Sequence, residues 1–373
     1  MTMAIERADV ETMAYRMSSR SDVPWHNLGK PITHDAEPEE MGREADLLWT
    51  VSKRRNIVLG TLDGLPEGVS LAEYVVGGGK LLSVNDFFTL VRDSDNKILG
   101  PAGKDFLPTQ NITLFKFLKK FTDAGKMTME TAGALQGGRQ VWVLAKLKMR
   151  LTLPGGDIVE GYLLISSPHI WGKSLVIKFV TIRVICANTF ALAMRETTYG
   201  KGFRMPHIRE FDDETVQAEA EATLGLATEM FDSFKEKAEL LASASVDTDV
   251  QVRYIADVLQ PEIVKAHLGM DFYDKYPANE RAKILVDPSS PKFDPQSLNR
   301  TAFSVFTQLA KQPGADMESS SGTLWGAFNA VTYHADHLAG RNRDNALTSA
   351  WFGANAVTKA RAMDRAVLLA KAL

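Results

Sequence analysis

The sequence contains a single cysteine, Cys186, and no uninterrupted apolar run of about 18 residues. One cysteine excludes an intramolecular disulfide and every metal site built from several cysteines. The lack of a long apolar run excludes a membrane-spanning helix. The first residues carry the acid Glu6 and no apolar segment, which is unlike a secretory signal. We therefore expect a cytoplasmic protein with no membrane partner.

The sequence also has few patterns that point to catalysis. The glycines of residues 77–80 lack the spacing and the hydroxyl residue of a phosphate-binding loop. His334 and His337 lie about one helical turn apart but have no third metal ligand nearby in the sequence. We expect no metal, no cofactor and no enzymatic activity. An enzyme built around Arg183, Asn188 and the histidines stays open, because folding can gather residues from distant segments.

The chain has 373 residues and a mass of 41.1 kDa, with 45% apolar and 24% charged residues. This composition is that of an ordinary globular protein, and the length favours two or three packing units. Prolines and acidic clusters without periodicity predict an extended N-terminal arm over residues 1–48. An α+β basic core domain is expected over residues 49–210, and a helical C-terminal region over residues 211–373.

Residues 49–210 carry mainly the period of two that is typical of β-strands. Residues 49–59 and 87–92 read as strands, and the turn residues 93–96 indicate that the second strand opens a hairpin. Asn111 is a good N-cap for a helix that would end near Gly125. Its lysines lie off the apolar stripe.

The clearest local signal is Gly137-Gly138, a two-residue loop between β-rich runs at 127–136 and 139–150. Further strands are expected at 158–167 and 174–186. These runs predict an antiparallel β-meander of about four strands with a packed helix. The fold class is therefore α+β, with the meander followed by a mainly α-helical C-terminal region.

After Asp213 the apolar period changes to 3.6, and it continues to Leu241. This predicts one long helix with a continuous apolar face, which would pack on other helices or on a neighbouring subunit. Further helices are expected at 297–311, 322–339 and 344–371, with a proline-rich break at 276–295. The long apolar face favours a homo-oligomer.

Charge is distributed unevenly along the chain. Residues 101–209 hold 16 Lys/Arg against 6 Asp/Glu, whereas residues 1–100 hold 11 against 16 and residues 210–373 hold 16 against 24. A basic segment within an acidic chain must face an anionic partner or be covered by the acidic flanks. The partner could therefore be nucleic acid or the protein's own flanking segments.

Alternation along residues 139–150 predicts a basic face on one strand. One side would be apolar core, and the other would carry Trp142, Lys146, Lys148 and Arg150 with cations about 7 Å apart. A solvated outer face with one supporting tryptophan would show the same pattern. Other residues that could complete a groove for single-stranded nucleic acid are Lys116, Lys119 and Lys120 on the helix, Trp171 and Lys173 on a loop, and Lys178 and Arg183 on the last strand.

Four short blocks resemble a known family. They are residues 24–29 (PWHNLG), 48–54 (LWTVSKR), 100–111 (GPAGK to QN) and 183–189 (RVICANT). Their combination is similar to the phage and plasmid proteins that share the domain of unknown function numbered nine hundred and thirty-two. Asn27 departs from the glycine usual in the first block. The resemblance implies a protein of a mobile genetic element that acts in the cytoplasm of a bacterial host cell, and it carries no known activity.

The expected core topology also looks like that of phage single-strand annealing proteins of the RecT, Redβ and Erf type, by analogy only. The leading hypothesis is a single-stranded DNA-binding and annealing protein that acts in homologous recombination as a ring or filament, without nucleotide hydrolysis. Trp142 would stack on bases and the cations would contact phosphates. The alternative is an oligomeric scaffold or host-takeover protein that binds protein.

Overall fold

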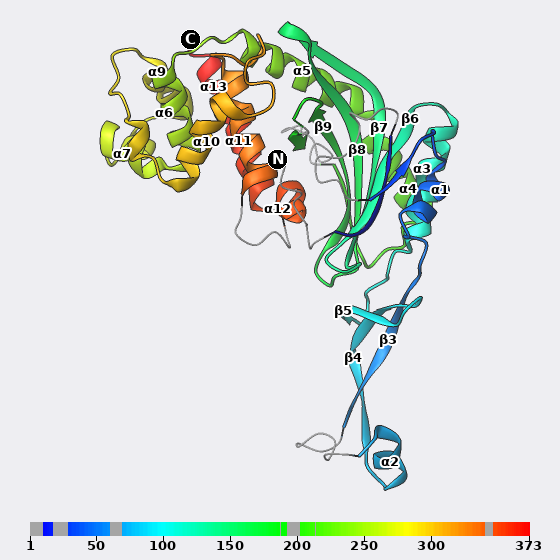
Figure 1. Ribbon diagram of the computed structural model, residues 1–373. Coiled ribbons are helices and arrows are strands. Elements are labelled where there is room, and N and C mark those ends of the chain that lie inside the picture. Colours follow the sequence, from blue (N-terminus) through cyan, green and yellow to red (C-terminus); the bar gives the residue numbers. More distant parts are fainter. Residues whose placement is uncertain are drawn as a thin grey trace.

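The computed structural model describes residues 10–17, 29–59, 69–186, 188–191, 202–212, 214–339 and 346–373. A curved sheet runs through the main body, with helices on both of its faces (Figure 1). The strand order is β10-β9-β8-β7-β6-β1-β2, and β11 pairs with β9. The strands are β1 (Val10–Arg16), β2 (Lys30–Ile32), β6 (Met127–Leu135), β7 (Gln140–Leu153), β8 (Asp157–Pro168), β9 (Ser174–Arg183), β10 (Asn188–Ala191) and β11 (Phe203–Pro206).

The predicted meander is confirmed, because β6, β7, β8 and β9 pair in sequence order and antiparallel. The turn between β6 and β7 contains Gly137 and Gly138 at φ +67° and +85°. Glycine adopts this left-handed region without steric cost, which explains the pair at this position. The α+β class follows from this antiparallel sheet and the mostly helical C-terminal region.

The described part of the N-terminal segment belongs to the body. Strand β1 pairs antiparallel with β6 and parallel with β2, and so extends the meander. The short helix α1 (Pro38–Glu44) packs on α3 (Asn111–Asp123) and buries Met41. The first block of the family resemblance lies outside the described residues, except for Gly29.

A second sheet projects from the body (Figure 1). It consists of β3 (Val51–Leu59), β4 (Leu81–Arg92) and β5 (Lys97–Gly103), and the short helix α2 (Leu71–Val76) lies beyond β3 and β4. We call residues 51–103 the projecting arm. The predicted hairpin at 93–96 is confirmed, with Asn96 at φ +58°. Helix α2 buries none of its residues, and Val76 is 88% exposed.

One face of the main sheet is covered by α1, α3 and α4 (Glu214–Gly225), and α5 (Ala227–Ser243) packs near the end of β7. Helix α3 begins at Asn111, but Gln110 is the N-cap; the Asn111 side chain is buried and donates to the Leu47 carbonyl. The long helix predicted from residue 213 is two helices that meet at Leu226. Most of its apolar face, including Val216, Phe231 and Leu241, is buried within this chain.

The C-terminal region contains α6 (Thr248–Leu259), α7 (Pro261–Leu268), α8 (Phe272–Lys275), α9 (Ala278–Val286), α10 (Arg300–Lys311), α11 (Leu324–Tyr333), α12 (Ala346–Phe352) and α13 (Ala354–Ala370). Helix α9 lies inside the stretch expected to break the helical region. The helix expected over 322–339 ends in a π-helical turn, His334–Leu338, and the last expected helix is divided at Gly353. Helix α12 covers the second face of the main sheet.

Candidate functional site

Alternation along β7 predicted that Trp142 lies on an open sheet face, but the structure buries it. Its side chain is only 2% exposed, and its ring meets the ring of Trp351 edge to face with the centroids 5.1 Å apart. Leu144, Tyr162 and Leu347 belong to the same buried cluster. Because α12 covers this face, Trp142 cannot stack on a base in this structure.

The row of cations predicted on β7 is also not continuous. Lys146 pairs with Glu160 at 2.7 Å. A β-bulge follows, since Lys146 lies opposite Tyr162 and Arg150 opposite Glu160. Lys148 lines a cavity on the sheet face that α3 and α4 cover. Tyr162, the partner of Lys146 in register, belongs to the opposite face, which α12 covers. The bulge therefore breaks the simple alternation on which the row depended.

The lysines of α3 are partly neutralised by the acidic flanks of the chain. Lys119 pairs with Glu37 and Asp123 at 3.0 and 2.9 Å, and Lys120 pairs with Glu221. Lys116 is exposed on the same helix. These cations lie on the helical layer and do not join Trp171 in one groove. Masking by acidic flanks, which the charge distribution left open, occurs here within one chain.

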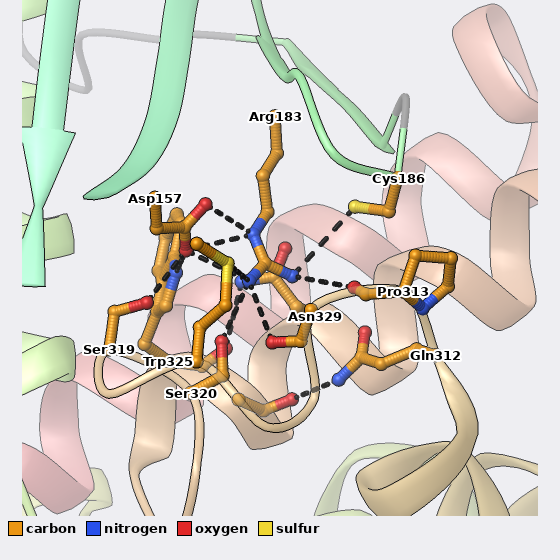
Figure 2. A network of polar contacts seen from close by, with 12 residues as sticks. Asp157, Arg183, Cys186, Gln312, Pro313, Ser319, Ser320, Trp325 and Asn329 are labelled. Carbon is orange, nitrogen blue, oxygen red and sulfur yellow. Dashed lines mark hydrogen bonds and ion pairs between the residues drawn. The ribbon is translucent and has the colours of Figure 1, made fainter. Parts of the chain in front are cut away.

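Arg183 is 2% exposed and forms a buried ion pair with Asp157 at 2.8 Å. Figure 2 shows the guanidinium enclosed between β8, β9 and the loop that precedes α11. Its Nη2 also donates to the Gly314 carbonyl and to Ser320 Oγ, and its Nη1 lies 3.8 Å from Cys186 Sγ. Arg183 therefore cannot contact a phosphate, and its role is to join the sheet to the C-terminal helices.

Asp157 completes this network. Its Oδ2 accepts hydrogen bonds from Ser319 Oγ at 2.7 Å and from Trp325 Nε1 at 2.9 Å. The pKa of Arg183 is raised despite the opposing effect of burial, because Asp157 and Cys186 favour its charged form. Each nitrogen of the guanidinium already has a partner, which leaves no donor for a substrate. The arrangement does not support an enzyme built around Arg183.

Lys178 is partly buried as well, and its ammonium lies 5.2 Å from the centroid of the Phe352 ring on α12. Burial and the nearby charge of Arg204 lower its pKa. Lys178 and Trp142 thus leave the predicted interface because α12 covers the sheet face from which they project. Arg183 leaves it for a different reason, because Asp157 and the loop before α11 enclose its guanidinium.

Trp171 and Lys173 lie in a different environment. Trp171 is 51% exposed and Phe87 is 48% exposed, and their rings meet edge to face at 5.9 Å. Both residues line a cavity of about 520 Å³ where the projecting arm joins the body. The ring of Trp171 lies against Gly103, where an added Cβ would be 3.4 Å from the indole. We call this cavity the arm-base pocket.

Four charged side chains line the arm-base pocket: Asp86, Lys104, Asp105 and Lys173. Within the part of the chain that the structure describes, none of the four forms an ion pair or a side-chain hydrogen bond. Lys53 Nζ donates to the Lys104 carbonyl at 2.6 Å, which places a fifth charge next to the pocket. The pocket therefore offers both cations and carboxylates to a ligand, beside an exposed aromatic pair.

Two buried histidines belong to this region: His207 lines the pocket, and His169 does not. His207 stacks on Phe106 with the ring centroids 4.7 Å apart. His169 Nε2 lies 3.0 Å from the side-chain oxygen of Asn111. Burial lowers the pKa of His169 to about 3, with a further contribution from His207, and burial lowers the pKa of His207 to about 4. Both rings are therefore neutral at pH 7.

Sequence patterns identified only part of this site. Trp171 and Lys173 were predicted, whereas Asp86, Phe87 and His207 were not. The pocket draws its walls from β4, from the segment after β5, from the β8–β9 turn and from the end of β11. No pattern along the chain brings these segments together. The available signal was the aromatic pair Phe87-Phe88 within β4.

His334 and His337, at which we expected no metal, lie in the π-helical turn that follows α11. Asp336, between His334 and His337, forms a buried ion pair with Lys359 of α13. Among the described residues there is no group of three or more His, Cys, Asp or Glu side chains placed to hold a metal ion. None of the described helices is long and apolar enough to cross a membrane.

One family matches most of the chain: residues 98–372 fit the family described as Domain of unknown function (DUF932). The chain belongs to the DUF932 family. Comparison with curated proteins and with solved structures gives no match. The DUF932 match includes the Arg183 network, Trp171, Lys173 and His207.

The DUF932 match begins near the start of β5, so it leaves out β3, α2 and β4. Asp86 and Phe87 therefore lie outside the matched region, although they face Trp171 across the pocket. In this member of the DUF932 family the arm-base pocket is formed partly by the matched region and partly by the projecting arm.

Proposed function

We propose that this protein binds single-stranded DNA, with one base held in the arm-base pocket. The observation that carries the proposal is the half-exposed Phe87–Trp171 pair at the rim of a cavity of about 520 Å³. Stacking on an aromatic ring contributes about 1–3 kcal/mol per base in single-strand binders. Any base has a face that can stack, so this contact gives affinity for many sequences.

The lysines supply the contacts to the backbone. Lys104 and Lys173 line the pocket and have no carboxylate partner among the described residues, so their ammonium groups are available to phosphates. Lys53 and Arg55 continue the positive charge along β3 on the projecting arm. Phosphate neutralisation releases counterions and makes the affinity depend on salt. We infer a strand that runs from the pocket along the arm.

The carboxylates of Asp86 and Asp105 would accept hydrogen bonds from the base. A carboxylate accepts a hydrogen bond from the amino group of cytosine, whereas thymine presents a carbonyl oxygen at the same position. The pocket is therefore expected to prefer cytosine over thymine. His207 is neutral at pH 7 and adds no charge to this wall.

The wider role that we propose is strand annealing in recombination by a phage or plasmid protein, like that of the RecT, Redβ and Erf proteins. The antiparallel meander with a packed helix supports this analogy. Annealing needs many bases held in register, so this role includes homo-oligomerisation. Leu71, Val76 and Leu82 form an exposed apolar surface on the projecting arm, which we call the arm tip and assign to this contact.

A direct test uses fluorescence anisotropy with labelled oligo-dC and oligo-dT at low salt. Trp171→Ala should weaken binding to oligo-dC by about 1–3 kcal/mol without changing the thermal midpoint. Lys116→Ala is the matched control, because Lys116 is an exposed lysine on α3 and does not line the pocket. No binding of either oligonucleotide by the folded protein would refute the proposed function. Binding that Trp171→Ala leaves unchanged would move it away from this pocket.

The scaffold alternative gives a different result in the same experiments. An oligomeric protein that binds protein would show no oligonucleotide binding, while light scattering would still detect oligomers. Val76→Asp on the arm tip would then reduce the molar mass, since it places a charge on an exposed apolar surface. A monomer at all concentrations, with and without oligonucleotide, would contradict both the annealing role and the scaffold alternative.

A further inference from the structure

A second cavity of about 520 Å³ lies on the sheet face that α3 and α4 cover, between α3, β7 and the junction of α4 with α5. It shares no lining residue with the arm-base pocket. Its volume is within the range of about 300–1,000 Å³ that is typical of small-molecule sites. We call it the helix-junction cavity.

The walls of the helix-junction cavity are mostly apolar. Phe121 comes from α3, Leu147 and Met149 from β7, Phe179 from β9 and Leu224 from α4. Leu147 and Phe179 are buried, whereas Phe121, Met149 and Leu224 are partly exposed. A ligand that filled the cavity would cover these partly exposed side chains, and removing apolar surface from water is favourable.

The rim carries two free cations. Lys126 and Lys148 both line the cavity, and the Lys148 ammonium lies next to Gly125 at the end of α3. In the described parts of the chain neither lysine side chain has an ion-pair or hydrogen-bond partner. Glu221 is the one acid among the described lining residues, and it is paired with Lys120. The rim therefore presents uncompensated positive charge.

We propose that the helix-junction cavity binds a medium-chain fatty carboxylate. The alkyl chain would lie against Phe121, Met149 and Leu224, and the carboxylate would lie at the rim with Lys126 and Lys148. An apolar cavity with a few polar groups at one end is the usual form of a small-molecule site. The ammonium groups of Lys126 and Lys148 favour an anionic head group, because hydrogen bonds between charged partners are strong. Lys120 is already neutralised by Glu221 and takes no part in this recognition.

The test is calorimetric titration of the full chain with octanoate, with octanol and acetate as matched probes. Octanoate should bind at one site with a dissociation constant in the millimolar range or below. Octanol lacks the charge and acetate lacks the alkyl chain, so both should bind at least about tenfold more weakly, which corresponds to about 1.4 kcal/mol. Octanol binding as tight as octanoate, or no octanoate binding by the folded protein, would overturn the proposal.

Variants locate the binding. The double variant Lys126→Gln/Lys148→Gln should weaken octanoate binding about tenfold and leave octanol binding unchanged. Thr228→Phe places a bulky ring at an exposed lining position and should block octanoate, whereas Glu229→Phe, one residue further on α5 and outside the lining, should not. Equal effects of the two α5 variants would show that octanoate binds elsewhere, against the proposal.

Discussion

The ring of Trp142 on β7 meets the ring of Trp351 on α12 edge to face at 5.1 Å, and this contact joins the sheet to the C-terminal helices. It replaces the open, base-stacking face that the strand pattern predicted. The two tryptophans are more than 200 residues apart in the sequence. The pair therefore forms only when the C-terminal region folds over the meander.

This contact predicts a large cost for truncation. Trp142→Ala should lower the free energy of unfolding by about 3–5 kcal/mol, because it leaves a cavity between β7 and α12. Trp171→Ala removes a half-exposed ring and should change it by no more than about 0.5 kcal/mol. Urea denaturation of both variants measures the difference. Equal stability of the two variants would be inconsistent with a buried Trp142.

The Arg183–Asp157 pair predicts strong coupling between two substitutions. Arg183→Met should destabilise the fold by about 3–5 kcal/mol, because it leaves the Asp157 carboxylate buried without its cation. The double variant Arg183→Met/Asp157→Leu should lose less than the sum of the single variants, since no charge remains buried. A double-mutant cycle from denaturation curves gives the coupling. Additive losses would show that the pair is not a unit.

The buried histidines predict a loss of stability at acidic pH. Their pKa values in the folded protein, about 3 for His169 and about 4 for His207, lie below the ordinary value of about 6.5. Between these values the unfolded chain binds more protons than the folded chain, so the free energy of unfolding falls as the pH falls. Each histidine should account for a loss on the order of 2 kcal/mol between pH 7 and pH 5.

The measurement compares the free energy of unfolding at pH 7 and pH 5 for the wild type and for His207→Phe. The variant keeps an aromatic ring against Phe106 but has no titratable group. Its loss between the two pH values should be smaller by about the contribution of one histidine. A variant that loses as much as the wild type would show that His207 is not held neutral in the fold.

Salt dependence tests the lysines of the proposed DNA site. If Lys53, Lys104 and Lys173 each neutralise one phosphate, the logarithm of the binding constant should fall with the logarithm of salt concentration at a slope of about −2. Lys173→Ala should reduce the magnitude of this slope by about 0.7. Lys119→Ala should leave it unchanged, because Lys119 is paired with Glu37 and Asp123. A slope that Lys173→Ala does not alter would exclude Lys173 as a phosphate contact.

Local structure in this protein was largely determined by the sequence. The Gly137-Gly138 turn, the hairpin at 93–96 and the apolar stripe of α3 each depend on neighbouring residues, and each appears in the structure. Glycine at positive φ and apolar residues at helical spacing follow rules that act within a few residues. For the same reason the strands of the meander could be predicted in order.

Which side chains are exposed was decided only by the tertiary structure. Alternation correctly separates the two faces of β7 near Trp142, but it cannot show that α12 buries the second face. It also cannot show that Arg183 lies inside a network with Asp157. Charge along the sequence likewise does not reveal that Lys119 and Lys120 meet acids from distant segments. Burial and ion pairing depend on contacts between residues far apart in the chain, and such contacts exist only after the elements have packed.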